Sequence, residues 1–482
     1  MNAVIVVGII AFLLCLVATP ICRDLFLKFK IVDHPDQVRK LHLKPIPRIG
    51  GIAIVFSYAG ALGLVLLLAP HGAAISIQHE KLFLALLPAT ALIFVTGLVD
   101  DIIGLKPKQK LAGQLVAAAI AVALGARMSI LGSFPHASWI TIPLSLVWLV
   151  GCTNALNLID GLDGLASGVG LFATITTLLA AIATGNSGLA IATVPLVGCL
   201  LAFLRYNFRD ASVFLGDCGS LTIGFMLGCF GLIWSQHSGT MLGMAAPLTA
   251  LALPIVDVSL SIGRRFLRSA PIFKGDRGHI HHMVLARGFK PHVATLILYG
   301  VSAVAALFAL LESFTRLHQF RGYILFFFCL LALAGVNYLG YIELSAARRT
   351  LSHKNLFRVL REEIYLQELE HSITAASTTE DIWQLVRDAC KDMCFASVQM
   401  FFLGQTFEAV FESSDVDPSW KMMIGTGRTG YLILTRLAET RPPRLMVSVL
   451  CMLQECLREQ HYTVVKTPVT SPSQVHITSQ VA

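Results

Sequence analysis

Oxygen-bearing side chains suited to a hard metal ion lie at three places in the first half of the chain. Carboxylate and amide oxygens are the ligands that Mg²⁺ prefers in proteins. In the middle group they recur every three residues, which would form a slowly turning polar stripe on a helix. Gly161 and Gly164 would let a ligand or a neighbouring helix approach the backbone there. The set comprises Asp100 and Asp101, then Asn154, Asn157, Asp160 and Asp163, and finally Asp217.

Positive and hydrogen-bonding side chains accompany these acids. The string Gly-Asp217-Cys-Gly-Ser opens an apolar run, so free N–H groups at a helix N-terminus would be available to phosphate. His279-Ile-His281-His282 could suggest zinc, but no cysteine lies nearby and the preceding arginines would repel a second cation. We therefore interpret it as an anion-binding loop, with zinc or a plain solvated loop as alternatives. The cations nearby in sequence are Lys106, Lys108, Lys110, Arg264, Arg265, Arg268, Lys274 and Arg277.

Each cluster has a simpler interpretation when it is taken alone. Asp100 and Asp101 could close a helix at an interface, Asp217 could be an N-cap, and the basic segment 33–51 could be a topology signal. Together, acids for magnesium and cations for phosphates suit a diphosphate substrate. Phosphoryl transfer needs positioning and charge neutralisation more than covalent machinery. The absence of a Walker loop or kinase signature argues against ATP hydrolysis.

Long apolar runs surround the clusters. Of the 482 residues, 55% are apolar and 14% are charged, whereas an ordinary soluble domain has roughly 25% charged residues. A membrane span needs about 20 apolar residues, so the sequence predicts an all-α polytopic membrane protein. Residues 1–21 have no basic start and no cleavage site, which favours a retained span over a signal peptide. The eleven predicted spans are 2–22, 50–69, 82–99, 110–126, 139–154, 165–184, 187–204, 219–235, 243–262, 293–311 and 321–342.

The distribution of Lys and Arg predicts the orientation of these spans. One set of alternate loops (23–49, 100–109, 155–164, 205–218 and 263–292) contains 18 of them, and the other set contains 3. By the positive-inside rule, the N-terminus is outside and the C-terminus is cytoplasmic. All the polar clusters then lie on the cytoplasmic face. The net charge of +8 fits this topology and anionic substrates rather than nucleic acid, and the eleven scattered cysteines are interpreted as unpaired thiols.

The composition changes after about residue 343. Residues 1–345 form the predicted membrane domain, 346–375 a linker helix, 376–465 a small cytoplasmic α+β domain, and 466–482 a disordered tail. Within the small domain we predict helices at 378–394, with Thr378 as N-cap, and 444–459, and strands at 396–403, 407–412 and 431–437. This order resembles a truncated GAF-type sensor module. Its aromatic residues suit a core better than a cofactor site: Trp383, Phe401, Phe402 and Phe411.

The motifs resemble a known family over residues 1–345. Asp100-Asp101, the strings around Asp160 and Asp217, and His279-Ile-His-His are similar, in order and spacing, to signature loops of the polyprenyl-phosphate N-acetylhexosamine-1-phosphate transferases (glycosyltransferase family 4). The Gly-His-Ile-His-His form resembles the WecA/TagO-like branch, which uses UDP-GlcNAc. The branch that transfers phospho-MurNAc-pentapeptide usually carries three consecutive histidines. The resemblance implies ten or eleven spans, Mg²⁺ or Mn²⁺ dependence, tunicamycin sensitivity, and a site facing the cytoplasm in a bacterial inner membrane.

The resemblance also implies roles for individual residues. It predicts GlcNAc-1-phosphate transfer from a UDP-sugar to undecaprenyl or another polyprenyl phosphate, with release of UMP, in cell-wall or lipopolysaccharide O-antigen synthesis. The acceptor phosphate is mostly dianionic at pH 7 because its second pKa is about 6, so Asp100 could orient rather than deprotonate it. A covalent aspartyl-phosphate route stays open. The implied roles are metal contact for Asn157 and Asp217, catalysis for Asp100, Asp101, Asp160 and Asp163, and substrate binding for Lys110 and Asn207. The anion-binding interpretation of the histidine loop adds five predicted substrate-binding residues: Arg264, Arg265, His279, His281 and His282.

Two other functional classes are rivals to a transferase. A secondary transporter would place ionisable residues near mid-span and show repeat symmetry, whereas here they gather at one face and no repeat is visible. A membrane receptor with a cytoplasmic sensor would explain the tail but not the polar loops between the spans. A homodimer is compatible with each of these classes. Release of UMP from UDP-GlcNAc, with and without polyprenyl phosphate, would separate the three classes.

Overall fold

A computed structural model describes residues 2–29, 45–68, 80–128, 138–236, 244–267, 278–314, 320–340, 356–411, 420–426, 430–436, 443 and 445–466. The chain divides into two compact units. The first comprises residues 1–266 with 270–339, and the second comprises residues 267–269 with 340–482. Asp33, His34 and the basic residues up to Lys44 lie outside the described residues, as do Arg268, Lys274 and Arg277.

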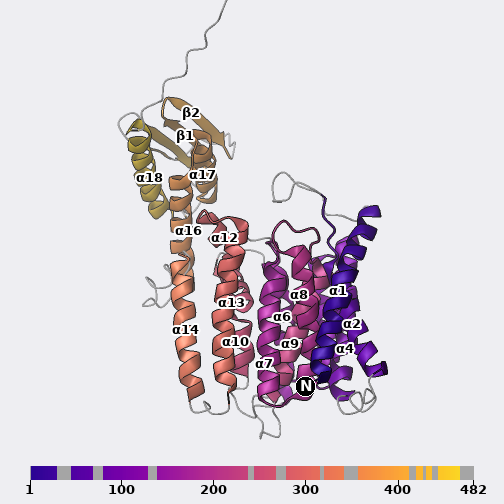
Figure 1. Cartoon of the computed structure of the whole chain (residues 1–482). Helices are drawn as coiled ribbons and strands as arrows, with labels where there is room; N and C mark the ends of the chain where they lie inside the picture. The colour runs from indigo at the N-terminus through magenta and orange to yellow at the C-terminus, as the bar shows by residue number, and fades with distance from the viewer. Residues whose placement is uncertain are drawn as a thin grey trace, which may run out of the picture. The chain divides into compact units, whose positions relative to one another are not determined.

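The first unit is built from helices that run side by side (Figure 1). Helix α9 is buried along its whole length and contacts α2, α4, α6, α7 and α8. A helix that is apolar on all sides is typical of a buried position. Its backbone hydrogen bonds are formed within the helix, as the interior of a bilayer requires. The helices are α1 (Asn2–Lys28), α2 (Gly50–Leu68), α4 (Glu80–Ile103), α5 (Pro107–Ala123), α6 (Ser138–Ile159), α7 (Leu165–Ala183), α8 (Ser187–Asn207), α9 (Asp217–Gln236), α10 (Ala245–Ala250), α11 (Ala252–Leu267), α12 (Ile280–Ala286), α13 (Pro291–Ser313) and α14 (Arg321–Tyr338).

Seven helices of the described part are long and apolar enough to cross a membrane, and Gly50–Val65 and Gly322–Tyr338 are shorter apolar helices. A polytopic helical protein is therefore confirmed, while the count of eleven spans and the orientation stay predictions. The span predicted at 243–262 consists of two helices that meet at Leu251, so its helix is interrupted there and its crossing of the membrane stays a prediction. Pro254 accounts for the break, since it has no N–H to donate to the carbonyl of Ala250.

Helix α11 carries a buried polar face. Asp257, Ser261 and Arg264 are at most 5% exposed and follow one another at helical spacing on one side. The apolar side chains of Ile262 and Phe266 are 47% and 64% exposed. This arrangement is the reverse of a water-facing surface helix and directs the polar side chains into the unit.

The second unit is a small α+β domain, as predicted. Its helices are α16 (Leu356–Ala375), α17 (Thr379–Asp392) and α18 (Met446–Lys466). Its strands β1 (Ser397–Phe402), β2 (Gln405–Val410), β3 (Trp420–Gly425) and β4 (Tyr431–Arg436) form an antiparallel sheet in the order β2-β1-β4-β3. Strand β3 was not predicted. The predicted N-cap is confirmed, because the Thr378 side chain accepts a hydrogen bond from the Asp381 N–H at 3.1 Å.

The core of the second unit lies on one face of its sheet. Trp383 and Phe402 are buried in it and Phe411 packs against it. Phe401 was expected in the same core, but it stacks on Tyr431 with ring centroids 5.4 Å apart. Successive strand residues point to opposite faces, so Phe401 and Phe402 cannot both face the helices.

Candidate active site

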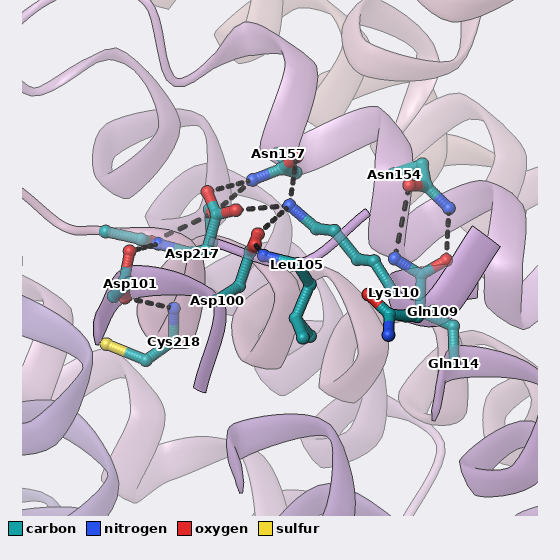
Figure 2. A network of polar contacts seen from close by, with 12 residues as sticks. Asp100, Asp101, Leu105, Gln109, Lys110, Gln114, Asn154, Asn157, Asp217 and Cys218 are labelled. Carbon is teal, nitrogen blue, oxygen red and sulfur yellow. Dashed lines mark hydrogen bonds and ion pairs between the residues drawn. The ribbon is translucent and has the colours of Figure 1, made fainter. Parts of the chain in front are cut away.

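The ammonium group of Lys110 lies among oxygens from three other helices (Figure 2). Asp100 Oδ2, at the end of α4, is 2.9 Å away. Asp217 Oδ2, at the start of α9, makes a second ion pair, and Asn157 Oδ1 of α6 lies at 3.5 Å. Three oxygen-bearing residues from three helices therefore meet around one positive charge.

The turn between α4 and α5 places Lys110. The N–H of Leu105 donates to Asp100 Oδ1 at 2.6 Å, and the N–H of Lys106 donates to Gln109 Oε1 at 3.0 Å. Pro107 begins α5, where its missing N–H costs nothing. Lys110 therefore lies in the first turn of α5 and reaches back over the end of α4.

A reciprocal amide pair supports this contact one turn deeper (Figure 2). Asn154 Nδ2 donates to Gln114 Oε1 at 2.6 Å, and Gln114 Nε2 donates to Asn154 Oδ1 at 3.2 Å. Gln114 follows Lys110 by one turn of α5, and Asn154 precedes Asn157 by nearly one turn of α6. The pair fixes the spacing of the two helices beneath the Lys110–Asn157 contact. Gln114 was missed by the sequence reasoning.

Asp101 caps helix α9 from α4. Its two carboxylate oxygens accept hydrogen bonds from the N–H groups of Asp217 and Cys218, each at 2.8 Å. The Ser220 N–H donates to Gly216 O at 2.9 Å. The prediction that the N–H groups at this helix start are free to bind phosphate is therefore wrong. A negative charge at this position also complements the helix dipole.

The Asp217 carboxylate is held on its other side by α6. Asn157 Nδ2 donates to Asp217 Oδ1 at 2.9 Å and to Ser220 Oγ at 2.8 Å. Asn157 therefore orients Asp217 through its amide nitrogen while its Oδ1 stays on the side of Lys110.

Glycines allow the backbone of three segments to meet at the start of α9. A Cβ on Gly51 would lie 2.3 Å from Gly219 N, and one on Gly97 would lie 2.5 Å from Asp217 O. Gly216 has a φ of +74° and lies against Arg48 O. Phe214 N donates to Pro47 O at 2.9 Å, so the end of the basic segment is a structural part of the site and more than a topology signal.

The turn after α6 carries Asp160 and Asp163. Burial and then the negative charge of Asp217 raise the pKa of Asp160 to about 7, although Arg48 opposes the shift. Asp163 Oδ2 accepts a hydrogen bond from Ala211 N at 3.0 Å. Asp163 thus ties this turn to the segment that leads to α9.

Asn207, at the end of α8, is buried and bonded at both ends of its amide. Its Nδ2 donates to Val213 O at 2.9 Å, and its Oδ1 accepts from Ser167 Oγ at 2.8 Å. The structure thus places Asn207 inside the 207–213 loop, and its role toward a nucleotide stays a prediction.

The histidine segment reaches the Asp160 turn. His281 Nε2 would lie 2.5 Å from a Cβ on Gly161, so only glycine fits at that position of the turn. Burial and the neighbouring charge of His282 lower the pKa of His281 to about 4, so its ring is neutral at pH 7. The guanidinium of Arg264 lies against Gly278, at the start of the segment, whereas Arg265 is only half-buried.

A further acid, Asp257 of α11, was missed by the sequence reasoning. Its Oδ2 lies 2.9 Å from His279 Nδ1, and its Oδ1 accepts the N–H of Ile280 at 2.7 Å. A single acid within the apolar run 245–262 was the signal that could have found it, because such residues are costly in a membrane.

The oxygens around Lys110 fit a hard cation. Within the described residues, no group of three or more His, Cys, Asp or Glu side chains that could hold a metal ion is found. The candidate position instead combines the carboxylates of Asp100 and Asp217 with the amide oxygen of Asn157. Their convergence on an ammonium group indicates that a positive charge is favoured there, and oxygen donors of this type suit Mg²⁺.

Comparison with known proteins supports a common family. A model of glycosyl transferase family 4 matches residues 83–235, which include the cluster around Lys110. A probable undecaprenyl-phosphate N-acetylglucosaminyl 1-phosphate transferase of Bacillus subtilis is 34% identical over 316 residues, or 64% of this chain and 85% of that relative. A decaprenyl-phosphate N-acetylglucosaminephosphotransferase of Mycolicibacterium smegmatis is 32% identical over 331 residues, or 62% and 80% of the two chains. An undecaprenyl-phosphate alpha-N-acetylglucosaminyl 1-phosphate transferase of Escherichia coli is 28% identical over 312 residues, or 61% and 80%. The chain belongs to glycosyl transferase family 4.

Proposed function

We propose that this protein transfers GlcNAc-1-phosphate from UDP-GlcNAc to a polyprenyl phosphate such as undecaprenyl phosphate, with release of UMP. The observation that carries the proposal is the cluster of Asp100, Lys110, Asn157 and Asp217, in a chain whose relatives bear the names of such transferases. Anionic and cationic groups side by side suit a diphosphate substrate that arrives with a divalent cation.

The proposed reaction needs no general base. An oxygen of the acceptor phosphate attacks the β-phosphorus of the UDP-sugar, and the bond from that phosphorus to the bridging oxygen breaks, so the oxygen leaves on UMP. The acceptor is mostly dianionic at pH 7, so no proton has to be removed. Asp100 Oδ2 is already paired with Lys110 at 2.9 Å, and its Oδ1 accepts the N–H of Leu105 at 2.6 Å, so both of its oxygens have partners. We therefore assign Asp100 to orientation rather than to deprotonation.

The residues of the cluster divide the remaining work. Asp217 and Asn157, with Asp100 beside them, would hold Mg²⁺ or Mn²⁺, which neutralises charge on the diphosphate when bound. Lys110 offers a second positive charge at the same place. Asp101 fixes the backbone at the start of α9. The amide pair of Gln114 and Asn154 fixes the spacing of α5 and α6 beneath the cluster.

We also propose that the site faces the cytoplasm in a bacterial plasma membrane and that its product initiates a lipid-linked envelope glycan. The asymmetry of 18 against 3 basic residues between the two sets of loops supports this orientation.

The test is release of UMP by the purified protein in detergent with UDP-GlcNAc, Mg²⁺ and undecaprenyl phosphate. We expect release only when the acceptor is present, and none from the Asp217→Asn variant. UDP-GalNAc and UDP-MurNAc-pentapeptide serve as competing donors. Faster turnover of UDP-MurNAc-pentapeptide would move the protein to the other branch of the family, and transport of a solute without UMP release would refute the proposal.

A further inference from the structure

Asp257 is a buried carboxylate that the proposed chemistry does not use. It is 1% exposed on α11, and its neighbours on that face are Ser261 and Arg264. Removing a carboxylate from water costs several kcal/mol unless its oxygens are well hydrogen-bonded. Both oxygens of Asp257 do have partners, His279 Nδ1 and the N–H of Ile280. Neither partner belongs to the cluster around Lys110.

The two bonds connect two helices, α11 and the short α12 that follows it in the chain. Asp257 lies in the second turn of α11, whereas His279 and Ile280 lie at the start of α12, 22 and 23 residues further on. The Ile280 bond satisfies an N–H that α12 itself leaves open. The His279 bond fixes which nitrogen of the ring faces the carboxylate and therefore how the ring is turned.

From His279 the packing continues to the Asp160 turn. The rings of His279 and His281 are nearly parallel, at 8°, with centroids 5.8 Å apart, and His281 and His282 are 4.2 Å apart. His281 in turn lies against Gly161, next to Asp160. A change at Asp257 is therefore passed through two rings to the turn whose acids border the cluster of Asp217.

We propose that Asp257 is a positioning residue for the sugar-nucleotide side of the reaction. Its carboxylate holds the His279 ring and the first N–H of α12, and so keeps the histidines seated on the Asp160 turn. This inference rests on the proposed function, because it takes the histidine segment to bind the diphosphate of the UDP-sugar. Asp257 itself touches no reacting atom.

The conservative variant Asp257→Asn separates this role from a purely structural one. The amide oxygen can still accept the Ile280 N–H, but the amide nitrogen then faces His279 Nδ1 and requires it to be an acceptor. The opposite tautomer of His279 results, with the shape of the site preserved. Groups that orient a functional histidine are typically worth 10-fold to 100-fold, so we expect kcat/KM for UDP-GlcNAc to fall by about that factor. The KM for the polyprenyl phosphate should change by less than about threefold, because the proposal assigns the histidine segment to the diphosphate of the UDP-sugar.

A double-mutant cycle with His279→Gln tests whether Asp257 acts through His279. We expect Asp257→Asn to cost less than about twofold in the His279→Gln background, because the orienting bond is already lost there. The matched control is Glu312→Gln in α13, which removes another carboxylate buried to 2% exposure, and it should leave turnover within about twofold of wild type. An equal loss from Asp257→Asn in both backgrounds would overturn the inference.

Binding of UMP is measured by calorimetry on the four proteins of the cycle: wild type, the two single variants and the double variant. This measurement tests the inference separately from the proposed function. If the wild type binds UMP but transfers no sugar phosphate, the proposed function fails, and the cycle is still read from the dissociation constants. Weaker UMP binding in Asp257→Asn that depends on His279 supports the inference. Unchanged binding and unchanged turnover in Asp257→Asn refute it, and a wild type that neither binds UMP nor turns over contradicts both.

Discussion

Asp100 and Asp101 are adjacent acids with different contacts in the structure, and substitution of each by asparagine should separate their roles. Asp101 accepts two backbone N–H groups at the start of α9, each at 2.8 Å. The side-chain amide of the Asp101→Asn variant would keep one acceptor and turn an NH₂ group toward the other N–H. Asp100 instead pairs with Lys110 and accepts a single N–H, from Leu105. The amide oxygen of the Asp100→Asn variant can still accept that N–H.

The size of the effect follows from these contacts. Loss of one hydrogen bond to a charged acceptor costs about 1.5–3 kcal/mol, and loss of a negative charge at a helix N-terminus costs about 0.3–1 kcal/mol more. The Asp101→Asn variant should therefore be destabilised by about 2–4 kcal/mol. For a unit of this size that corresponds to a fall in Tm on the order of 5 °C. The Asp100→Asn variant should lose activity with a change in Tm of less than about 2 °C.

The assay is thermal unfolding of both variants in the same detergent, followed by size-exclusion chromatography of the remaining monodisperse protein, alongside UMP release. Both variants should transfer more slowly than wild type, and only Asp101→Asn should melt earlier. A wild-type Tm for Asp101→Asn would refute the capping role. An equal fall in Tm for both variants would show that the two acids do the same work.

Three further predictions concern the cation site, the pH dependence and the second unit. Asp217→Asn should lower kcat by about 100-fold or more at saturating Mg²⁺, because several kcal/mol of charge stabilisation are lost; near-normal turnover at low Mg²⁺ would contradict the ligand role. The pKa of Asp160 is raised to about 7, above about 3.9 in the unfolded chain, so the folded state binds more protons and loses stability as pH rises from about 4 through 7. Asp160→Asn should accordingly raise Tm at pH 8 without added Mg²⁺ and change it little at pH 4, and a lower Tm at pH 8 would show the opposite sign. A chain ending near Arg349, just beyond the first unit, should insert and keep transferase activity; a folded truncated protein without UMP release would mean that the second unit is needed for turnover.

The residue types of the site could be read from the sequence because their chemistry is conspicuous beside apolar runs. Asp100, Lys110, Asn157 and Asp217 were singled out in this way, and the structure brings them into contact. Their individual roles in catalysis stay predictions. What the sequence could not show is which partners satisfy each group. The Asp217 N–H was expected to be free, yet its partner Asp101 lies 116 residues earlier.

Residues that support the site were harder to find. Gln114 and Asp257 are single polar residues within helices, and only their tertiary partners, Asn154 and His279, show why they are there. The break between α10 and α11 had a local signal in Pro254, which was outweighed by the length of the apolar run. Strand β3 (Trp420–Gly425) has six residues like the three predicted strands, and its pairing with β4 is what defines it.

The measurement that tests the central claim most directly is acceptor-dependent release of UMP from UDP-GlcNAc by the purified chain. Wild-type protein with Mg²⁺ and undecaprenyl phosphate should release UMP and form one GlcNAc-diphospholipid for each UMP. Omission of the acceptor or substitution of Asp217 by asparagine should abolish both products. UMP release that does not depend on the acceptor, or an Asp217→Asn variant that transfers at the wild-type rate, would contradict the account.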